Sequence, residues 1–146
     1  MDSVFAEQVE EIENYLRQIA GVVRRKGRVM LEDYKITPPQ FDALLILNYQ
    51  GVLTIGDLSN KLYLAYSTTT DLVDRLERAE FVVRERDTVD RRVVRVKMQT
   101  KGTKLIEEVL DARRAYLAGI LESMDRDNID EILRVLHLLN DKMTQS

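Results

Sequence analysis

The sequence contains no cysteine, and His137 is its single histidine. Without cysteine the chain can form neither disulfides nor zinc–thiolate sites, and no thiol can act as a redox sensor. A phosphate-binding glycine loop is also missing, and no apolar run approaches the roughly 18 residues of a membrane span. The sequence therefore predicts no catalytic site, metal site, cofactor or membrane partner. His137 is expected at a surface or an interface.

The N-terminus is acidic, and its first basic residue is Arg17. A secretory signal requires a basic start followed by an apolar run, so the chain is expected to be cytoplasmic. Its 146 residues match the size of one domain, and no repeat or linker interrupts them. We therefore expect a single domain over 1–146.

Charge is distributed unevenly along the chain. The net charge is −3, which is unusual for a protein that binds nucleic acid. Eight basic and three acidic residues lie between 84 and 104, so this segment carries +5 and the rest of the chain −8. A basic patch on an acidic body is the electrostatic pattern of a nucleic-acid interface, although a solvated pair of strands would show the same charges.

The segment 2–34 is predicted to form one long helix, because apolar residues recur in it with heptad-like spacing. At 1.5 Å per residue it would be roughly 45 Å long. Gly21 and Gly27 should weaken it by up to ~1 kcal/mol each. So long an apolar seam favours a two-fold dimer over a monomeric bundle. The seam consists of Phe5, Val9, Ile12, Leu16, Ile19, Val23 and Met30.

The central part, 37–99, has the order helix, helix, helix, strand, strand. Thr37 and Gln40 have the spacing of a capping box, and Gly51 ends the first of these helices. Two further helices are expected from 100 onward, and with 1–34 they are the predicted dimerisation helices over 1–34 and 100–146. The fold class is mainly α with a small β-wing (α+β). The expected central elements are helices over 37–50, 54–63 and 66–79 and strands over 81–86 and 93–98.

The helices over 54–63 and 66–79 have helix-turn-helix proportions. In that motif the N-terminal residues of the second helix face base edges in the major groove. Threonines are poor helix formers, but their hydroxyls and methyls can contact DNA, whereas Ser67 or Thr68 could instead cap the helix. The predicted contacts on this helix are Ser67, Thr68, Thr69, Thr70 and Arg75.

A charged hairpin tip joins the two strands. Arg91 and Arg92 could enter a narrow minor groove, and Asp90 could orient Arg75 or Arg92. The alternative is a turn aspartate followed by solvated arginines. Three more basic residues, Lys61, Arg84 and Arg95, are expected to neutralise phosphates.

These residues resemble the MarR (multiple antibiotic resistance regulator) family of transcription factors. The wing signature is Asp90-Arg91-Arg92 followed by Val94-Val96-Met98 and Thr100-Lys101-Gly102, and Leu72-Val73-Asp74-Arg75-Leu76-Glu77 matches the second half of the family's recognition helix. The resemblance covers essentially the whole chain. It implies a winged helix-turn-helix flanked by dimerisation helices, and a homodimer on a pseudo-palindromic double-stranded DNA operator. It also implies repression that a small phenolic or lipophilic effector releases.

Three positions depart from the family pattern. Glu80 stands where the family usually has glycine, so a left-handed turn there would cost roughly 1 kcal/mol. Gln99 replaces a capping threonine, a role that Thr100 could assume. Asp71 occupies a position that is often basic. With the net negative charge, Asp71 leaves a second hypothesis open, a dimeric winged-helix adaptor that binds protein.

The sequence does not identify an effector-binding residue. Aromatic residues could line a cleft between the dimerisation helices and the central part, but they would serve equally well in the core. They are Tyr15, Tyr34, Phe41 and Tyr116.

Overall fold

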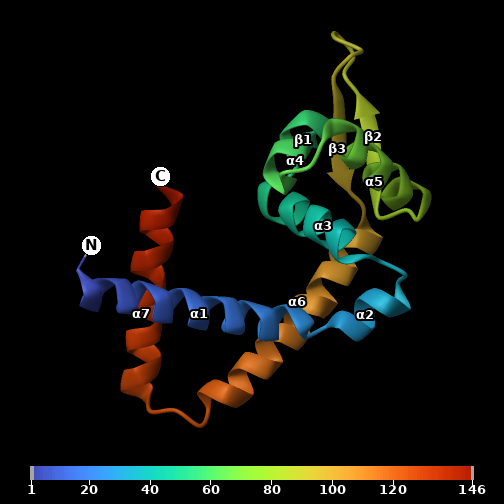
Figure 1. The fold of residues 1–146 in the computed structure, drawn as a ribbon. Helices are drawn as coiled ribbons and strands as arrows, with labels where there is room; N and C mark the ends of the chain where they lie inside the picture. The colour runs from blue at the N-terminus through green and yellow to red at the C-terminus, as the bar shows by residue number, and fades with distance from the viewer. Residues whose placement is uncertain (1, 146) are drawn as a thin grey trace.

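The computed structural model describes residues 2–145, which form seven helices and three short strands. The predicted class, mainly α with a small β-wing, is confirmed (Figure 1). In chain order the elements are α1 (Ser3–Arg25), α2 (Arg28–Asp33), α3 (Pro38–Gln50), β1 (Leu53–Thr54), α4 (Ile55–Leu62), α5 (Tyr66–Arg78), β2 (Val82–Arg86), β3 (Val94–Met98), α6 (Thr100–Leu121) and α7 (Arg126–Thr144).

The winged unit consists of α3, α4, α5 and a three-stranded antiparallel sheet in the order β1-β3-β2. β2 and β3 pair over their full length, from Val82 opposite Met98 to Arg86 opposite Val94. The sequence did not predict β1, because its two residues are too short to show alternation. Phe81 and Val96 are fully buried in the core beneath the sheet. The β2–β3 hairpin projects from this core as the wing (Figure 1).

Capping contacts set the start of α3 and α4. The Gln40 amide donates to Thr37 Oγ1 at 3.3 Å, and the Thr37 amide donates to Gln40 Oε1 at 2.9 Å, which confirms the capping box. Thr54 caps α4 by accepting the Asp57 amide at 3.0 Å. These contacts satisfy amides that lack a partner within the first helical turn.

The expected single helix over 2–34 is wrong, because the chain breaks between α1 and α2. Gly27 lies at the break with φ 85°, and a Cβ there would come within 2.9 Å of Val109 Cγ1 on α6. Arg113 of α6 donates to the carbonyls of Arg24 and Lys26 at 3.5 and 3.4 Å, at the end of α1. Packing against α6 therefore bends the chain where local sequence predicted continuity.

Two of the three departures from the family pattern, Glu80 and Gln99, lie at the ends of helices. Glu80 does adopt the left-handed conformation, with φ 67°, and the following Phe81 amide donates to the Leu76 carbonyl at 2.9 Å. The turn after α5 therefore keeps its shape without glycine. Gln99 occupies the N-cap of α6 without a side-chain hydrogen bond, and Thr100 is already the first helical residue. The expectation that Thr100 caps this helix is wrong.

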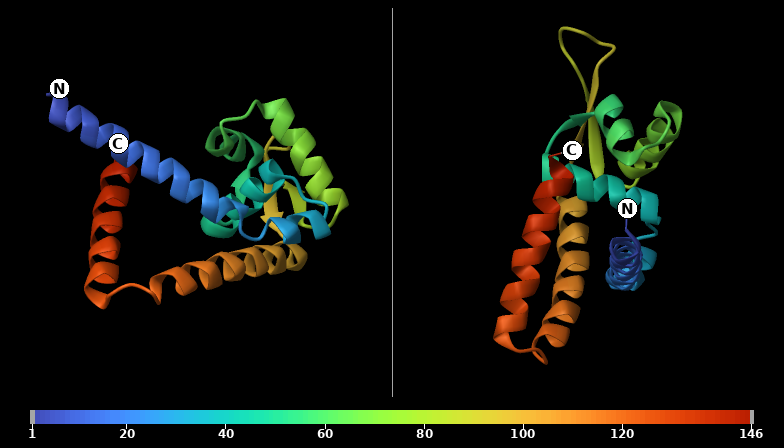
Figure 2. Two further views of the ribbon diagram at one scale, coloured as in Figure 1. Left: turned by 60° about the horizontal axis from the view of Figure 1, so that its bottom comes forward. Right: turned by 60° about the vertical axis from the view of Figure 1, so that its left-hand side comes forward.

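α1 and α7 extend away from the winged unit, and α6 connects that unit to α7 (Figures 1 and 2). Neither α1 nor α7 buries a side chain within the described chain. No helix in residues 2–145 has the length and apolar character needed to cross a bilayer. The exposed apolar residues of these arms include Phe5, Val9, Ile12, Leu16, Ile19, Ile132, Leu133, Leu136 and Met143.

Candidate nucleic-acid interface

α5 buries one face and turns the opposite one outward. Its buried residues are Thr69, Leu72, Val73 and Leu76. Thr69 is 0% exposed and its hydroxyl donates to the Ala65 carbonyl at 3.1 Å, so the expected DNA contact through Thr69 is wrong. Thr69 lies on the same buried face of α5 as Leu72, Val73 and Leu76.

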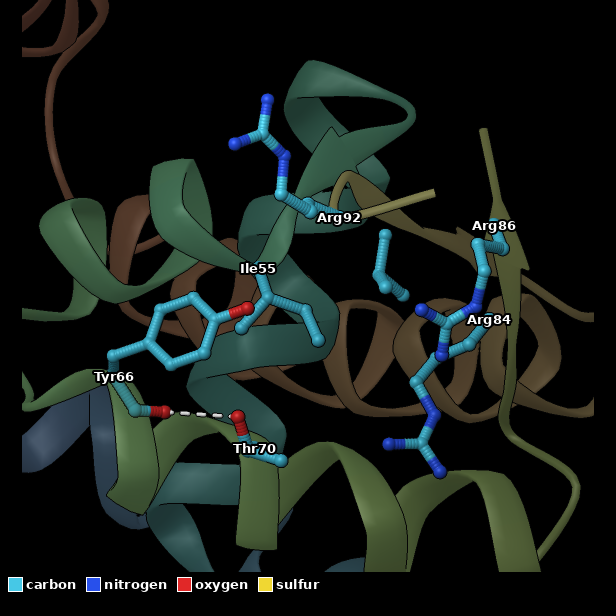
Figure 3. Close-up of a pocket in the computed structure, with 7 residues that line it drawn as sticks. Ile55, Tyr66, Thr70, Arg84, Arg86 and Arg92 are labelled. Atoms are coloured by element: carbon cyan, nitrogen blue, oxygen red, sulfur yellow. Dashed lines mark hydrogen bonds between the residues drawn. The ribbon is translucent and has the colours of Figure 1, made fainter. Parts of the chain in front are cut away.

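The other early residues of α5 remain near the surface. Ser67 and Thr68 are exposed, and neither caps the helix, because Ala65 occupies the N-cap. The predicted capping role is therefore wrong for both. Thr70 is half-buried and its hydroxyl donates to the Tyr66 carbonyl at 3.0 Å (Figure 3). Its hydroxyl oxygen still has a lone pair to offer, while Ser67 and Thr68 keep their full hydrogen-bonding capacity.

A cleft of about 500 Å³ separates α5 from the wing. Figure 3 shows the Tyr66 ring on one side and the side chains of Arg84 and Arg86 on the other. Ile55 lies between them and Arg92 stands at the rim. Three arginines line this cleft, where a phosphate backbone could lie between helix and wing; carboxylates partner Arg84 and Arg92, and Arg86 forms no ion pair within residues 2–145.

Arg84 connects the wing to α5 through ion pairs. Its guanidinium contacts Asp74 Oδ1 at 2.5 Å and Glu77 Oε1 at 3.0 Å, and its own amide donates to Glu77 Oε2 at 2.7 Å. Partial burial would lower the pKa of Arg84, but these two carboxylates raise it above its usual range. Its positive charge is therefore largely neutralised by two carboxylates of α5, whereas the sequence predicted that Arg84 would neutralise a phosphate.

Asp87 organises the tip of the wing. Its carboxylate accepts the amides of Val89 and Asp90 at 3.0 and 2.7 Å, and it accepts Arg95 Nη1 at 2.7 Å. The Asp90 amide, then Arg95 and the Val89 amide, hold the pKa of Asp87 below its usual range. Arg95, predicted to neutralise a phosphate, is thus tied to the wing, with its side chain 44% exposed.

Asp90 orients Arg92, which was one of the two partners expected for it. Its Oδ1 accepts both the Arg92 amide and Arg92 Nε at 3.1 Å, and Arg92 lowers the pKa of Asp90. The Arg92 side chain is 91% exposed, so this pair leaves its outer edge open. Within residues 2–145, Asp90 forms no hydrogen bond or ion pair with Arg75, the other expected partner, which is exposed on α5.

Three predicted basic contacts are exposed and carry no side-chain ion pair within residues 2–145: Lys61, Arg75 and Arg91. Sequence reasoning missed Arg86 and Tyr66 as contributors to the cleft. Arg86 Nη1 donates to the Arg91 carbonyl at 2.6 Å and so links strand to tip. Side chains two residues apart in a strand lie on the same face. The sequence of β2 could therefore have indicated that Arg84 and Arg86 lie on one face of the wing.

A three-helix core with an antiparallel sheet and a charged hairpin defines the class of winged helix-turn-helix proteins. The sequence pattern of the MarR family matches residues 36–94. The Bacillus subtilis HTH-type transcriptional regulator YsmB is 47% identical over 129 residues, 88% of each chain. A MarR family protein from Bacillus stearothermophilus superposes with a TM-score of 0.85 at 47% identity, over 99% of both chains. The chain belongs to the MarR family of transcriptional regulators and is not an enzyme.

A further relative has a more specific name. The Bacillus subtilis HTH-type transcriptional repressor MdtR is 30% identical over 108 residues, which are 74% of this chain and 68% of MdtR. These similarities agree with DNA-binding regulation. None of them supports the alternative of an adaptor that binds protein.

Proposed function

We propose that this regulator binds a pseudo-palindromic operator as a homodimer, in the cytoplasm, with α5 in the major groove and the wing at the minor groove. The observation that carries the proposal is the cleft between α5 and the wing, which is lined from the segment 84–104 of net charge +5 on a chain whose net charge is −3. Of the arginines on this cleft, Arg86 forms no ion pair within residues 2–145, and Arg92 is 91% exposed beside Asp90. Ser67, Thr68, Thr70 and Arg75 would face bases, and Lys61, Arg86, Arg91, Arg92 and Arg95 would face the backbone or the minor groove.

The dimer follows from the uncovered faces of the arms. Leu133 is 69% exposed and Ile12 54%, although both belong to apolar stripes of helical period. Monomeric proteins rarely leave contiguous apolar faces of this kind in water. A second copy of the chain would cover them under two-fold symmetry and would place two α5 helices on successive half-sites.

Replacing Arg92 with alanine tests the wing. We expect operator affinity, measured by mobility shift, to fall by about 1–3 kcal/mol and the salt dependence to become shallower. Arg114→Ala is the matched control, because Arg114 is also an exposed arginine beside an aspartate, 3.6 Å from Asp111 on α6. Equal affinity for Arg92→Ala and the control would remove the wing from the interface.

The proposal includes repression, in line with the name of MdtR, and release by an effector. A cleft of about 400 Å³ lies where α1, α3 and α6 meet. Phe41 lies on its wall, and the Arg113 guanidinium carbon lies 5.1 Å from the centre of the Phe41 ring. Phe41 is 2% exposed, so the group that the cleft offers a ligand is the Arg113 guanidinium, which suits an organic anion. The cleft also connects the arms to the winged unit, so occupancy could alter their relative position.

The charges around this cleft favour an anion over a neutral effector. Burial lowers the pKa of Arg113 and raises that of Asp42, which means that partial removal from water disfavours the charged form of each group. Arg24, Arg25 and Arg28 add positive charge and form no side-chain ion pair within the part of the chain described. Of the four aromatic candidates, Phe41 lines the cleft, Tyr34 donates to Glu108 at 3.2 Å, Tyr116 packs under Lys26, and Tyr15 is 54% exposed on α1.

Benzoate and its neutral counterpart benzamide distinguish an anion site from a merely apolar one. At ten times its dissociation constant, benzoate should stabilise the fold by about 1.4 kcal/mol, or several degrees in Tm, and should weaken operator binding. Arg113→Gln should abolish both effects, whereas the neighbouring Arg114→Gln should keep them. A shift that benzamide reproduces, or that persists in Arg113→Gln, would contradict the assignment.

A further inference from the structure

Asp71 occupies the centre of the outward face of α5. Successive residues of an α-helix are rotated by about 100°, so Asp71 and Ser67, one turn earlier, lie opposite the buried row of Thr69, Leu72, Val73 and Leu76. Both side chains are exposed. In the N-terminal half of a recognition helix, this is the position that enters the groove most deeply.

The charge of Asp71 is uncompensated, unlike that of the other two acids on α5. Arg84 pairs with Asp74 and Glu77 at 2.5 and 3.0 Å. Asp71 forms no hydrogen bond or ion pair within residues 2–145, even with Arg75 one turn later on the same helix. A free carboxylate on a surface that approaches phosphates is repelled by them, so this position disfavours binding unless the carboxylate meets a donor.

The major groove offers two kinds of base donor, the N4 amino group of cytosine and the N6 amino group of adenine. Adenine carries the N7 acceptor beside N6, which repels a carboxylate, whereas cytosine has no acceptor on that part of its own edge. A carboxylate therefore favours cytosine. We propose, on the basis of the proposed DNA binding, that Asp71 accepts a hydrogen bond from cytosine N4 in each half-site and is a specificity-determining residue.

The surroundings of Asp71 permit the close approach that this contact requires. An aspartate is short, so the helix must lie deep in the groove for its carboxylate to reach a base edge. Ser67 and Thr68, in the turn before it, are small and exposed, so neither side chain holds the helix away from a base edge. The long side chain of Arg78 follows towards the C-terminal end, where it can reach past the bases to the backbone.

Selection of bound sequences from a random duplex pool, carried out with the wild type and with Asp71→Asn, tests the inference. The wild type should enrich a cytosine at one position in each half of a palindrome. Asparagine pairs with adenine through N6 and N7, so Asp71→Asn should enrich adenine at the same two positions. By fluorescence anisotropy, exchanging this C·G pair for A·T should weaken the wild type by about 5- to 150-fold per half-site and should favour the variant.

Asp33→Asn is the matched control, because it removes one exposed carboxylate from α2, outside the winged unit. It should keep the wild-type cytosine preference. If Asp71→Asn binds all sequences more tightly by the same factor, Asp71 only repels the backbone and the inference is overturned. A palindrome with unchanged preference in Asp71→Asn also overturns it while leaving the proposed function intact. A wild-type selection that enriches no sequence overturns the proposed DNA binding itself.

Discussion

Leu136→Asp should convert the regulator into a folded monomer and reduce its operator affinity by at least a hundredfold. Leu136 lies near the middle of the apolar face of α7 and is 51% exposed in the single chain. The substitution therefore adds little strain within one subunit, but it places a charge where the second copy is expected to pack. Two half-sites bound by linked subunits gain about 10²–10⁴ in affinity over one, and the monomer loses this gain.

Asn128→Asp is the control for this substitution. It adds the same charge to α7 but near its N-terminus, where the helix dipole favours an acidic residue. Light scattering should report a dimer for Asn128→Asp and a monomer for Leu136→Asp, with the same helical circular dichroism per residue. A dimeric Leu136→Asp protein would show that α7 does not form the interface.

Arg84→Ala should weaken operator binding by about 2 kcal/mol, or roughly thirtyfold. The loss arises mainly from the two carboxylates that Arg84 neutralises, since without it Asp74 and Glu77 would face the DNA uncompensated. The wing would also lose its side-chain link to α5. Fluorescence anisotropy on an operator duplex measures the affinity, and thermal unfolding verifies that the variant is folded.

Neutralising the same two acids separates this role from a direct phosphate contact. The triple variant Asp74→Asn, Glu77→Gln, Arg84→Ala should bind within about threefold of the wild type, a span of less than 1 kcal/mol. The glutamine can still accept the amide of residue 84, which Glu77 accepts at 2.7 Å. If the triple variant binds as weakly as Arg84→Ala, Arg84 contacts DNA itself, as its place in the sequence first suggested.

The winged unit was predictable because short-range signals determine its elements. The Thr37–Gln40 capping box starts α3, and alternation marks β3, both within a few residues. The break before α2 was not predicted, although Gly27, with φ 85°, lies where a glycine commonly ends a helix. Only the structure shows that the missing side chain also allows the close approach of Val109, 82 residues later in the chain.

The candidate site was predictable in its location more than in the role of each residue. The basic segment and the start of α5 indicated the two sides of the cleft that the structure forms between α5 and the wing. The sequence could not show which arginines are ion-paired, because their partners come together only when the strands and helices pack. Examples are Arg84 with Glu77 and Arg95 with Asp87. Thr69 was misassigned because the run of three threonines concealed which of them continues the apolar row.

α6 also has a geometric consequence for recognition at a distance. Its first part is fixed to the winged unit through Gly102, Leu105, Ile106 and Val109, which are buried, whereas Leu117 and Ile120 near its far end are exposed. Its 22 residues span about 33 Å, so a tilt of about 10° at one end moves the other by roughly 6 Å. Successive half-sites lie about 34 Å apart. In the proposed dimer, α6 would therefore act as a lever arm, and a small change of angle at the two-fold axis would put both α5 helices out of register with the duplex.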